Sequence, residues 1–581
     1  MSFAPDTQNK EFQDALNLVK YTRQSLFLTG KAGTGKSTFL RYICENTKKK
    51  HVVLAPTGIA AINAGGSTLH SFFKLPFHPL LPDDPNLSLQ KGRIHDFFKY
   101  TKAHRKLLEE LELIIIDEIS MVRADIIDAV DRILRVYSHN LREPFGGKQI
   151  LLVGDVFQLE PVVKNDEREI LNRFYPTPYF FSAQVFSQID LVSIELQKVY
   201  RQSDPVFVGV LDRIRNNTVG AADLQLLNRR YGVDIAQAEA DMYITLATRR
   251  DQVDHINERK LNELPGDAVT FSGEIHGDFP ESSLPTSQEL VLKTGAQVIF
   301  IKNDFDKRWV NGTIGVVSGM DLDTETLYVI TDDGKECDVK RESWRNIRYK
   351  YNEEKKEIEE EELGTFTQYP LRLAWAITVH KSQGLTFARA VIDFTGGVFA
   401  GGQTYVALSR CTSLEGIQLK KPVGRADVFV RPEITQFARK FNDRQAIDRA
   451  LKQAQADLQY AAATRAFDRG DFDTFLQEFF KAIHARYDIE KPAVQRLIRR
   501  KLHIINRLRT ENQALKAATL EKEKALVKYA REYITMGDEC LKHGMKEAAM
   551  RNYEKAVTLC PKFKEAWTKI KKLDKELKKT H

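Results

Sequence analysis

The stretch from residue 26 to residue 45 restricts the fold of this chain more than any other. An apolar run, 26–29, leads into the loop Gly30-Lys31-Ala32-Gly33-Thr34-Gly35-Lys36-Ser37, and residues 37–45 favour a helix. Between a strand and a helix, this glycine spacing points successive backbone N–H groups inward at a helix N-terminus, where they bind phosphate. The sequence therefore predicts a nucleoside-triphosphate site in a parallel α/β domain.

Side chains of this loop have separate expected roles. We expect Lys36 to contact the β- and γ-phosphates and Ser37 to ligate Mg²⁺. The other loop residues that we expect at the nucleotide are Gly30, Gly33, Thr34, Gly35 and Thr38. Upstream, Gln8 has the donor and the acceptor needed to bind an adenine edge. A helix-capping role for the segment around Gln8 is an almost equal alternative, and Gln13 is the second candidate for the base.

Polar residues follow two further apolar strands. Asp117 and Glu118 end the run 113–116, and Gln158 lies in the turn after the strand 149–153. Because a pair of acids at the end of a buried strand is costly, a purely structural role is a weak explanation. We expect Asp117 to hold the Mg²⁺ shell, Glu118 to activate the attacking water and Gln158 to sense the γ-phosphate.

Other residues near strand ends have the chemistry of a single-stranded nucleic-acid surface. Thr57 follows the strand 51–55, and His70 and Phe72 follow a Gly-Gly-Ser-Thr turn. Hydroxyl and imidazole groups suit phosphates, and aromatic rings suit base stacking. One of Phe72 and Phe73 is expected to belong to the core instead. Phe157, beside Gln158, is a further candidate for the nucleic-acid side.

Three longer stretches resemble the Pif-one family of superfamily-one helicases, in the RecD-like branch. They are Ala55–Gly58 with Thr68–Phe72, Val199–Asp204 with Phe207, Leu211, Ile214 and Arg215, and Leu373–Thr386. The resemblance covers about residues 1–440, with the motifs in family order. Val156 and Glu160 depart from it, where the family more often has an aromatic residue and a proline.

The resemblance implies an ATP- and Mg²⁺-dependent DNA helicase with 5′→3′ polarity, acting in DNA repair, recombination or telomere maintenance. Its substrates would be single-stranded and forked DNA, and we expect a monomer. Gln383 and Gly384 would lie in a second phosphate-contacting loop, and His380 would face the DNA. Arg201 and Arg410 are the candidates for γ-phosphate contact across a cleft, with a surface ion pair as the alternative for either one. Competing functions are a nucleotide-switched adaptor and a translocase that does not separate strands.

The expected architecture is α/β, with two RecA-like parallel-sheet motor domains, a small β-barrel insertion and an all-α C-terminal extension. The first motor domain would span 1–190, including a loop-rich insertion at about 65–100. The second would combine 191–285 with 366–440. An inserted barrel, Src-homology-three-like by resemblance, would occupy 286–365, because short strands there alternate with turn signals. The acidic residues 357–362 are expected to lie in a solvated hairpin.

Residues 441–581 form a distinct helical region. Residues 451–581 hold 29 Lys and Arg against 18 Asp and Glu, whereas the first 450 residues hold 58 against 61. Residues 530–561 match the tetratricopeptide pattern, and 456–489 repeat it weakly. A helical appendage on the motor and a partner-binding module are equal alternatives, because about one and a half repeats are too few for a free solenoid. Basic residues near 496–509 allow either a protein or DNA as the partner.

The remaining sequence features concern zinc sites, disulfides, membrane association and cellular location. The five cysteines are widely spaced, with no CxxC pair or Cys/His cluster, so we expect neither a zinc site nor a disulfide framework. We also expect no membrane association, because neither a signal-type segment nor a long apolar run is evident. The expected location is the cytoplasm and nucleoid of a bacterium, or the nucleus or mitochondrion of a eukaryote.

Overall fold

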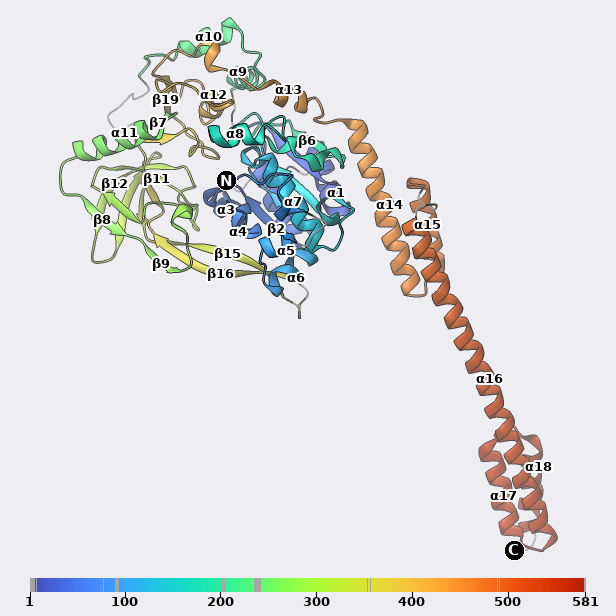
Figure 1. Ribbon diagram of the computed structural model, residues 1–581. Helices are drawn as coiled ribbons and strands as arrows, with labels where there is room; N and C mark the ends of the chain where they lie inside the picture. Colours follow the sequence, from blue (N-terminus) through green and yellow to red (C-terminus); the bar gives the residue numbers. More distant parts are fainter. Residues whose placement is uncertain are drawn as a thin grey trace. The chain divides into compact units, whose positions relative to one another are not determined.

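The computed structural model describes residues 6, 8–76, 78–88, 93–200, 202, 204–234, 242–352, 354–355, 357–487, 490 and 492–578. The chain forms two compact units, residues 1–485 and 486–581, and Figure 1 gives the labels of their elements. No helix among the described residues is long and apolar enough to cross a membrane.

The first motor domain contains a six-stranded parallel sheet. Across the sheet the strands are β3 (Ser67–Thr68), β2 (His51–Ala55), β4 (Leu113–Ile116), β5 (Gln149–Val153), β1 (Leu26–Gly30) and β6 (Val192–Leu196). Alternate residues face opposite sides: Leu113 packs in one core with Phe39, and Ile114 packs in another with Ile127. Burial of both faces explains why these strands are continuous apolar runs.

Helices supply the two outer layers of this domain. They are α1 (Lys10–Tyr21), α2 (Lys36–Asn46), α3 (Gly58–Ala64), α4 (Leu69–Phe73), α5 (Arg93–Phe97), α6 (Lys102–Glu110), α7 (Ala124–Tyr137) and α8 (Asn165–Leu171). Helices α1 and α2 contribute to the core that contains Leu113, and α4, α6 and α7 contribute to the core that contains Ile114. This arrangement gathers the carboxyl ends of β1, β4 and β5 at one edge of the sheet, where ligands bind in such folds.

The second motor domain has a smaller parallel sheet. Its strands, in order, are β18 (Ala376–Thr378), β7 (Ile244–Ala247), β19 (Ala390–Asp393) and β20 (Ile417–Leu419). The helices of this domain are α9 (Pro205–Arg215), α10 (Ala221–Asn228), α11 (Arg250–Glu263) and α12 (Gln403–Leu408). Two parallel-sheet domains in one chain confirm the fold class predicted from the sequence.

Antiparallel strands interrupt the second domain. They are β8 (Val269–Ser272), β9 (Glu274–Gly277), β10 (Glu289–Leu292), β11 (Gln297–Phe300), β12 (Ile314–Asp321), β13 (Thr326–Thr331), β14 (Glu336–Val339), β15 (Glu342–Asn352), β16 (Glu357–Gln368) and β17 (Leu371–Leu373). A five-stranded sheet runs β14-β13-β12-β11-β17, so β14 and β17 are its edges among the described strands, and closure into a barrel stays a prediction. Pairing of β8 with β10 and of β9 with β16 starts this region at 269 rather than at the expected 286.

The acidic residues 357–362 lie in β16, which forms a long hairpin with β15. This hairpin reaches the first motor domain, where Tyr349 packs in the core that contains Ile114. The Tyr349 hydroxyl accepts a hydrogen bond from the Val53 amide at 3.4 Å. The insertion is thereby held against the first domain.

Residues after 430 continue to pack on the first domain. In α13 (Pro432–Ala438), Phe437 stacks on Phe181 with ring centroids 4.4 Å apart. Asn442 exchanges two hydrogen bonds with the backbone of Glu195 in β6. Helix α14 (Arg444–Asp468) then buries Ile447 in the motor core and pairs with α15 (Phe472–Ala485). The expected border at 441 therefore falls inside a packed region.

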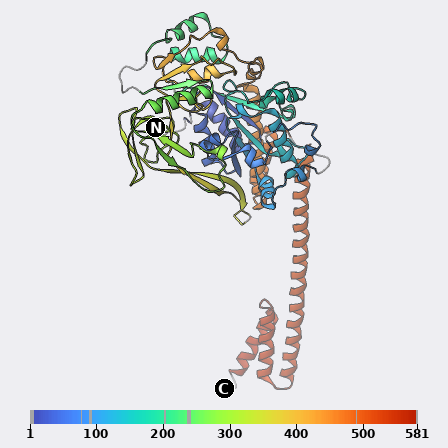
Figure 2. The same ribbon diagram turned by 60° about the vertical axis from the view of Figure 1, so that its left-hand side comes forward.

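The second unit contains the tetratricopeptide-like segment. Helix α16 (Pro492–Lys542) is followed by α17 (Lys546–Leu559) and α18 (Lys564–Leu577). Figures 1 and 2 show α17 and α18 alongside the C-terminal part of α16. A Cβ atom on Gly537 would come within 2.5 Å of the Tyr553 ring, so this close helix contact requires the glycine.

Candidate functional site

The glycine loop joins β1 to α2 and lines a cavity of about 490 Å³. Gly35 adopts a left-handed conformation (φ 92°) at the N-terminus of α2, which an L side chain rarely tolerates. A Cβ on Gly30 would meet Thr34 Oγ1 at 2.5 Å. The Lys36 ammonium donates to the carbonyls of Gly30 (2.7 Å) and Lys31 (3.0 Å). This loop thus points a helix N-terminus and a lysine at one cavity, as a phosphate site requires.

Two carboxylates follow β4. Asp117 Oδ1 accepts a hydrogen bond from the Glu118 amide at 2.9 Å, and burial raises the pKa of Asp117. Glu118 lines the cavity and has a left-handed backbone (φ 49°). Burial, followed by the neighbouring Asp117 charge, raises the pKa of Glu118 to about 7, against the opposing effects of Lys36 and Arg410. The raised pKa favours proton uptake by Glu118, which is the property that a general base needs.

A glutamine from the second motor domain contacts this carboxylate. Gln383 Nε2 donates to Glu118 Oε2 at 2.8 Å and to Gln158 Oε1 at 3.3 Å. Gln158 Nε2 in turn donates to Asp155 Oδ2 at 3.3 Å. One hydrogen-bond chain therefore connects both motor domains beside the phosphate loop.

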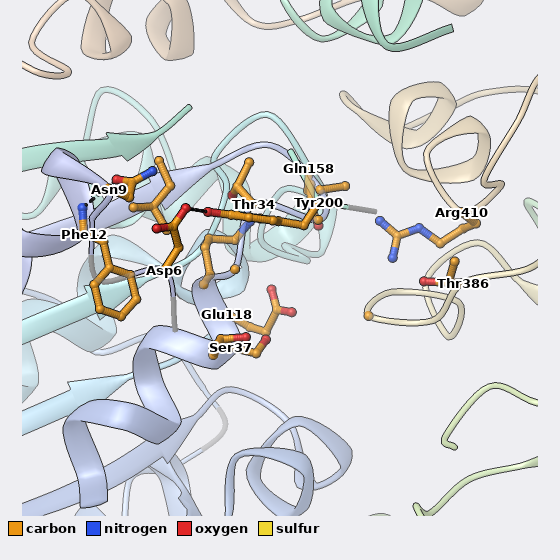
Figure 3. Close-up of a pocket in the computed structure, with 17 residues that line it drawn as sticks. Asp6, Asn9, Phe12, Thr34, Ser37, Glu118, Gln158, Tyr200, Thr386 and Arg410 are labelled. Atoms are coloured by element: carbon orange, nitrogen blue, oxygen red, sulfur yellow. Dashed lines mark hydrogen bonds between the residues drawn. The ribbon is translucent and has the colours of Figure 1, made fainter. Parts of the chain in front are cut away.

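Arg410 lines the same cavity from the residues after α12. Its side chain is almost fully buried, and its guanidinium donates to the carbonyls of Val406 and Leu385. Figure 3 shows it pointing toward the cavity from the side opposite Asp6 and Phe12. Arg201, the other predicted arginine, lies outside the described residues.

The opposite wall of the cavity contains residues that sequence analysis missed. Asp6, Asn9 and Tyr200 line it, whereas Gln8 is exposed and outside the lining. The Tyr200 hydroxyl donates to Asp6 at 2.9 Å, and its amide donates to the Gly33 carbonyl at 2.8 Å. Tyr200 lies within Val199–Asp204, one of the stretches that resemble the helicase family, so this motif could have identified it as a site residue. A role for Gln8 at the nucleotide stays a prediction.

Further contacts tie the phosphate loop to the second domain. The Tyr405 hydroxyl accepts from the Ala32 amide at 3.0 Å, and Lys31 pairs with Asp212 at 2.6 Å. Arg215 is buried, pairs with Asp155 at 3.0 Å and lies over the Phe157 ring at 4.2 Å. Of the other residues predicted at the nucleotide, the cavity lining includes Gly33, Thr34, Gly35, Ser37, Thr38 and Gly384, whereas Gly30 lies outside it.

Ser37 and Asp117 fit the predicted magnesium site by their chemistry, because both supply the hard oxygen donors that Mg²⁺ prefers. Asp117 is close enough to Lys36 for the two charges to interact. No cluster of three or more His, Cys, Asp or Glu side chains exists among the described residues.

A second cavity, of about 550 Å³, lies between the first motor domain and the insertion. Its lining includes Thr57, His70 and Ser71 from one side, and Phe279 and Arg345 from the other. It brings together two of the residues predicted to contact nucleic acid with a cation that sequence analysis did not select. The long β15–β16 hairpin positions Arg345 there.

The other three predicted nucleic-acid contacts lie elsewhere. Phe72 and Phe157 are each only 4% exposed, Phe72 packing edge-on against Phe73 and Phe157 lying under Arg215. His380 is partly buried and stacks on the exposed Phe399 at 6.4 Å. The structure presents neither phenylalanine ring to solvent, so base stacking by Phe72 or Phe157 stays a prediction.

The chain is similar to proteins of known activity. The sequence pattern of the PIF1-like helicase family matches residues 5–209. The ATP-dependent DNA helicase Pif1 of Campylobacter jejuni is 32% identical over 406 residues, covering 67% of this chain and 87% of that helicase. The human ATP-dependent DNA helicase PIF1 is 32% identical over 425 residues, covering 71% of this chain and 60% of that protein.

Solved structures extend the comparison to the fold. Bacteroides sp. Pif1 in complex with ADP-AlF4 is 42% identical, with a TM-score of 0.68 over 74% of this chain and 96% of that one. Bacteroides Pif1 bound to ssDNA is 41% identical, with a TM-score of 0.54 over 75% and 97% of the two chains.

Proposed function

This chain belongs to the PIF1-like helicase family, and we propose that it is an ATP-dependent DNA helicase that moves 5′→3′ along single-stranded DNA. One observation carries the proposal: Gln383 of the second motor domain hydrogen-bonds to Glu118 beside the phosphate loop of the first. Nucleotide chemistry between the two domains can therefore change their relative position. We place the activity in DNA repair, recombination and telomere maintenance, in the nucleoid of a bacterium or the nucleus or mitochondrion of a eukaryote.

In this proposal, ATP enters the cavity with its phosphates at the N-terminus of α2. Lys36 exchanges its present carbonyl partners for β- and γ-phosphate oxygens. Ser37 and Asp117 would hold Mg²⁺, which would neutralise phosphate charge. Tyr200 and Asn9 border the space available to the base.

Hydrolysis follows from the position of Glu118. Its carboxylate takes a proton from a water molecule, whose oxygen attacks the γ-phosphorus while the bond to the ADP oxygen breaks. Arg410 stabilises the negative charge that develops on the transferring phosphoryl group. Gln383 and Gln158 lie within one hydrogen-bond chain of Glu118, so loss of the γ-phosphate can reach the second domain through them.

The DNA path in this proposal uses the second cavity. The Thr57 and Ser71 hydroxyls suit contacts to strand phosphates, and Arg345 adds a positive charge. The order of the strands supports coupling between this path and the nucleotide, since Thr57 follows β2, and Asp117 and Glu118 follow the neighbouring strand β4. Closure around ATP would shift the strand held between the first domain and the insertion. Forked DNA is the proposed substrate.

Strand displacement tests the proposal and separates it from its alternatives. We expect release of the labelled strand from a duplex with a 5′ single-stranded overhang, dependent on ATP and Mg²⁺. A matched duplex with a 3′ overhang should stay intact. ATP turnover without release from either duplex would instead favour a translocase, and ATP binding without DNA-stimulated turnover would favour the nucleotide-switched adaptor.

A further inference from the structure

The N-terminal half of α16 presents an apolar stripe to solvent. Helices α17 and α18 cover α16 only from about Ala530 onward, where Ala530 and Ile534 are buried. Before that, Leu508 is 55% exposed and Leu515 is 69% exposed. Figures 1 and 2 show this half of α16 as a single extended helix. A lone helix gains little stability in water unless an apolar face is buried against a partner.

The spacing of the stripe identifies the kind of partner. Residues at heptad positions a are Ile498, Ile505, Asn512 and Thr519, and residues at positions d are Lys501, Leu508 and Leu515. Branched isoleucine at a with leucine at d favours two parallel helices. A single asparagine at an a position specifies register and a two-stranded state, because its amide pairs with the amide of the facing asparagine.

The charged residues on either side of the apolar stripe favour a second copy of the same helix as the partner. In the register set by Asn512, Glu511 occupies a g position and Lys516 the following e position, and both are exposed. In a parallel pair, Glu511 of one chain meets Lys516 of the other, and the two-fold axis makes this contact twice. Arg496, Arg499 and Arg500 occupy positions f, b and c. These basic residues therefore lie away from the interface between the two helices (the seam) and remain available for other contacts.

We propose that residues 498–519 form a parallel two-stranded coiled coil with a second copy of this chain. The full-length protein would then be a dimer with two motors, in place of the monomer that we expected from the sequence. The inference is independent of the helicase activity, because it rests on α16 alone. A competing occupant within the same chain is the exposed stripe of α15, which includes Phe472, Leu476 and Phe480.

Sedimentation equilibrium of the full chain over a concentration series tests this. We expect a monomer–dimer equilibrium in the wild type. Leu508→Glu should raise the dimer dissociation constant at least tenfold, because it places two carboxylates in the seam. Thr510→Glu, at position f on the outer face, is the matched control and should leave the constant unchanged. A wild type that stays monomeric throughout, or variants with equal constants, would overturn the proposal.

Charge reversal provides a second test that does not depend on tolerance of a core change. Glu511→Lys and Lys516→Glu should each weaken the dimer, and the double variant should recover wild-type affinity because attraction is restored across the seam. Asn512→Cys should form a disulfide between two chains under oxidising conditions that leave the wild type uncrosslinked. Failure of the double variant to recover affinity would contradict the parallel register. If the α16 stripe instead packs on α15, the protein should be a monomer and Leu508→Glu should lower its thermal midpoint. That result would also overturn the dimer.

Discussion

The side-chain amide of Gln383 donates a hydrogen bond to the Glu118 carboxylate over 2.8 Å, although the two residues belong to different motor domains. Glu118 lines the cavity beside the phosphate loop and is the residue that we propose to activate water, and Gln383 lies in the loop after β18. We infer that movement of the second domain alters the surroundings of Glu118, the carboxylate that we propose as the catalytic base. Reciprocally, we infer that a change at Glu118 reaches the loop that contains Gln383.

Gln383→Ala should lower DNA-stimulated ATP turnover about ten- to a hundredfold, the range expected when a hydrogen bond to a charged group is lost. ATP affinity should change little, because Gln383 is not among the residues that line the nucleotide cavity. Steady-state turnover and fluorescent-nucleotide binding measure the two effects. Gln418→Ala, in β20 of the same sheet and outside the cavity, serves as control. Equal turnover in the two variants would remove the coupling role.

Glu118→Gln should bind ATP with near wild-type affinity and hydrolyse it at least about a hundredfold more slowly, because the amide cannot accept the proton from water. The variant should also stay bound to single-stranded DNA while ATP is present. Nucleotide binding and the lifetime of the DNA complex measure these properties. Loss of nucleotide binding would mean that Glu118 has another role.

Short sequence motifs at the ends of strands were enough to predict the residues of the phosphate loop and the acid after β4. Lys36, Ser37 and Glu118 meet at one cavity because the ends of parallel strands share one edge of a sheet. Tyr200 and Asp6 were missed because their pairing depends on how the N-terminal segment packs against residues 198–200. Whether an aromatic residue at a strand end is exposed also depends on packing, and the structure buries Phe157 beneath Arg215.

Domain borders were predicted less well than motifs. Residues 269–277 carry little strand periodicity, yet pairing with β10 and β16 makes them part of the insertion. The change in composition near residue 441 does not mark a domain border, because Asn442 hydrogen-bonds to Glu195 in β6 and Ile447 is buried in the motor core. Such contacts are long-range in sequence and leave no local pattern.

His104 should make the first motor domain sensitive to acid. Burial, with help from Lys74, lowers the pKa of His104 to about 4 from 6.5. As the pH falls below 6.5 the unfolded chain takes up this proton first, so stability is complete above pH 6.5 and declines toward pH 4. The loss between pH 7 and pH 5 is about 2 kcal/mol. The thermal midpoint of the wild type should fall further over this interval than that of His104→Gln; equal falls would contradict the shift.

Truncation after Ala485 should keep DNA-stimulated ATP turnover and make DNA binding less dependent on salt. The removed residues hold 25 Lys and Arg against 13 Asp and Glu, and lost phosphate contacts reduce the slope of log affinity against log salt. Changing Arg496, Arg499 and Arg500 to Gln in the full chain tests the charges alone and spares the seam of α16. Unchanged slopes in both proteins would leave protein docking as the better account of the tail.

In the proposed function, ATP hydrolysis between the two domains drives directional movement along single-stranded DNA. Release of streptavidin from biotinylated oligonucleotides measures that movement without requiring strand separation. We predict ATP-dependent release from the 3′ end, with little from the 5′ end, and no release by Lys36→Ala, which loses the phosphate contact and should still bind DNA. Rapid DNA-stimulated ATP turnover by the wild type without release from either end would contradict the claim.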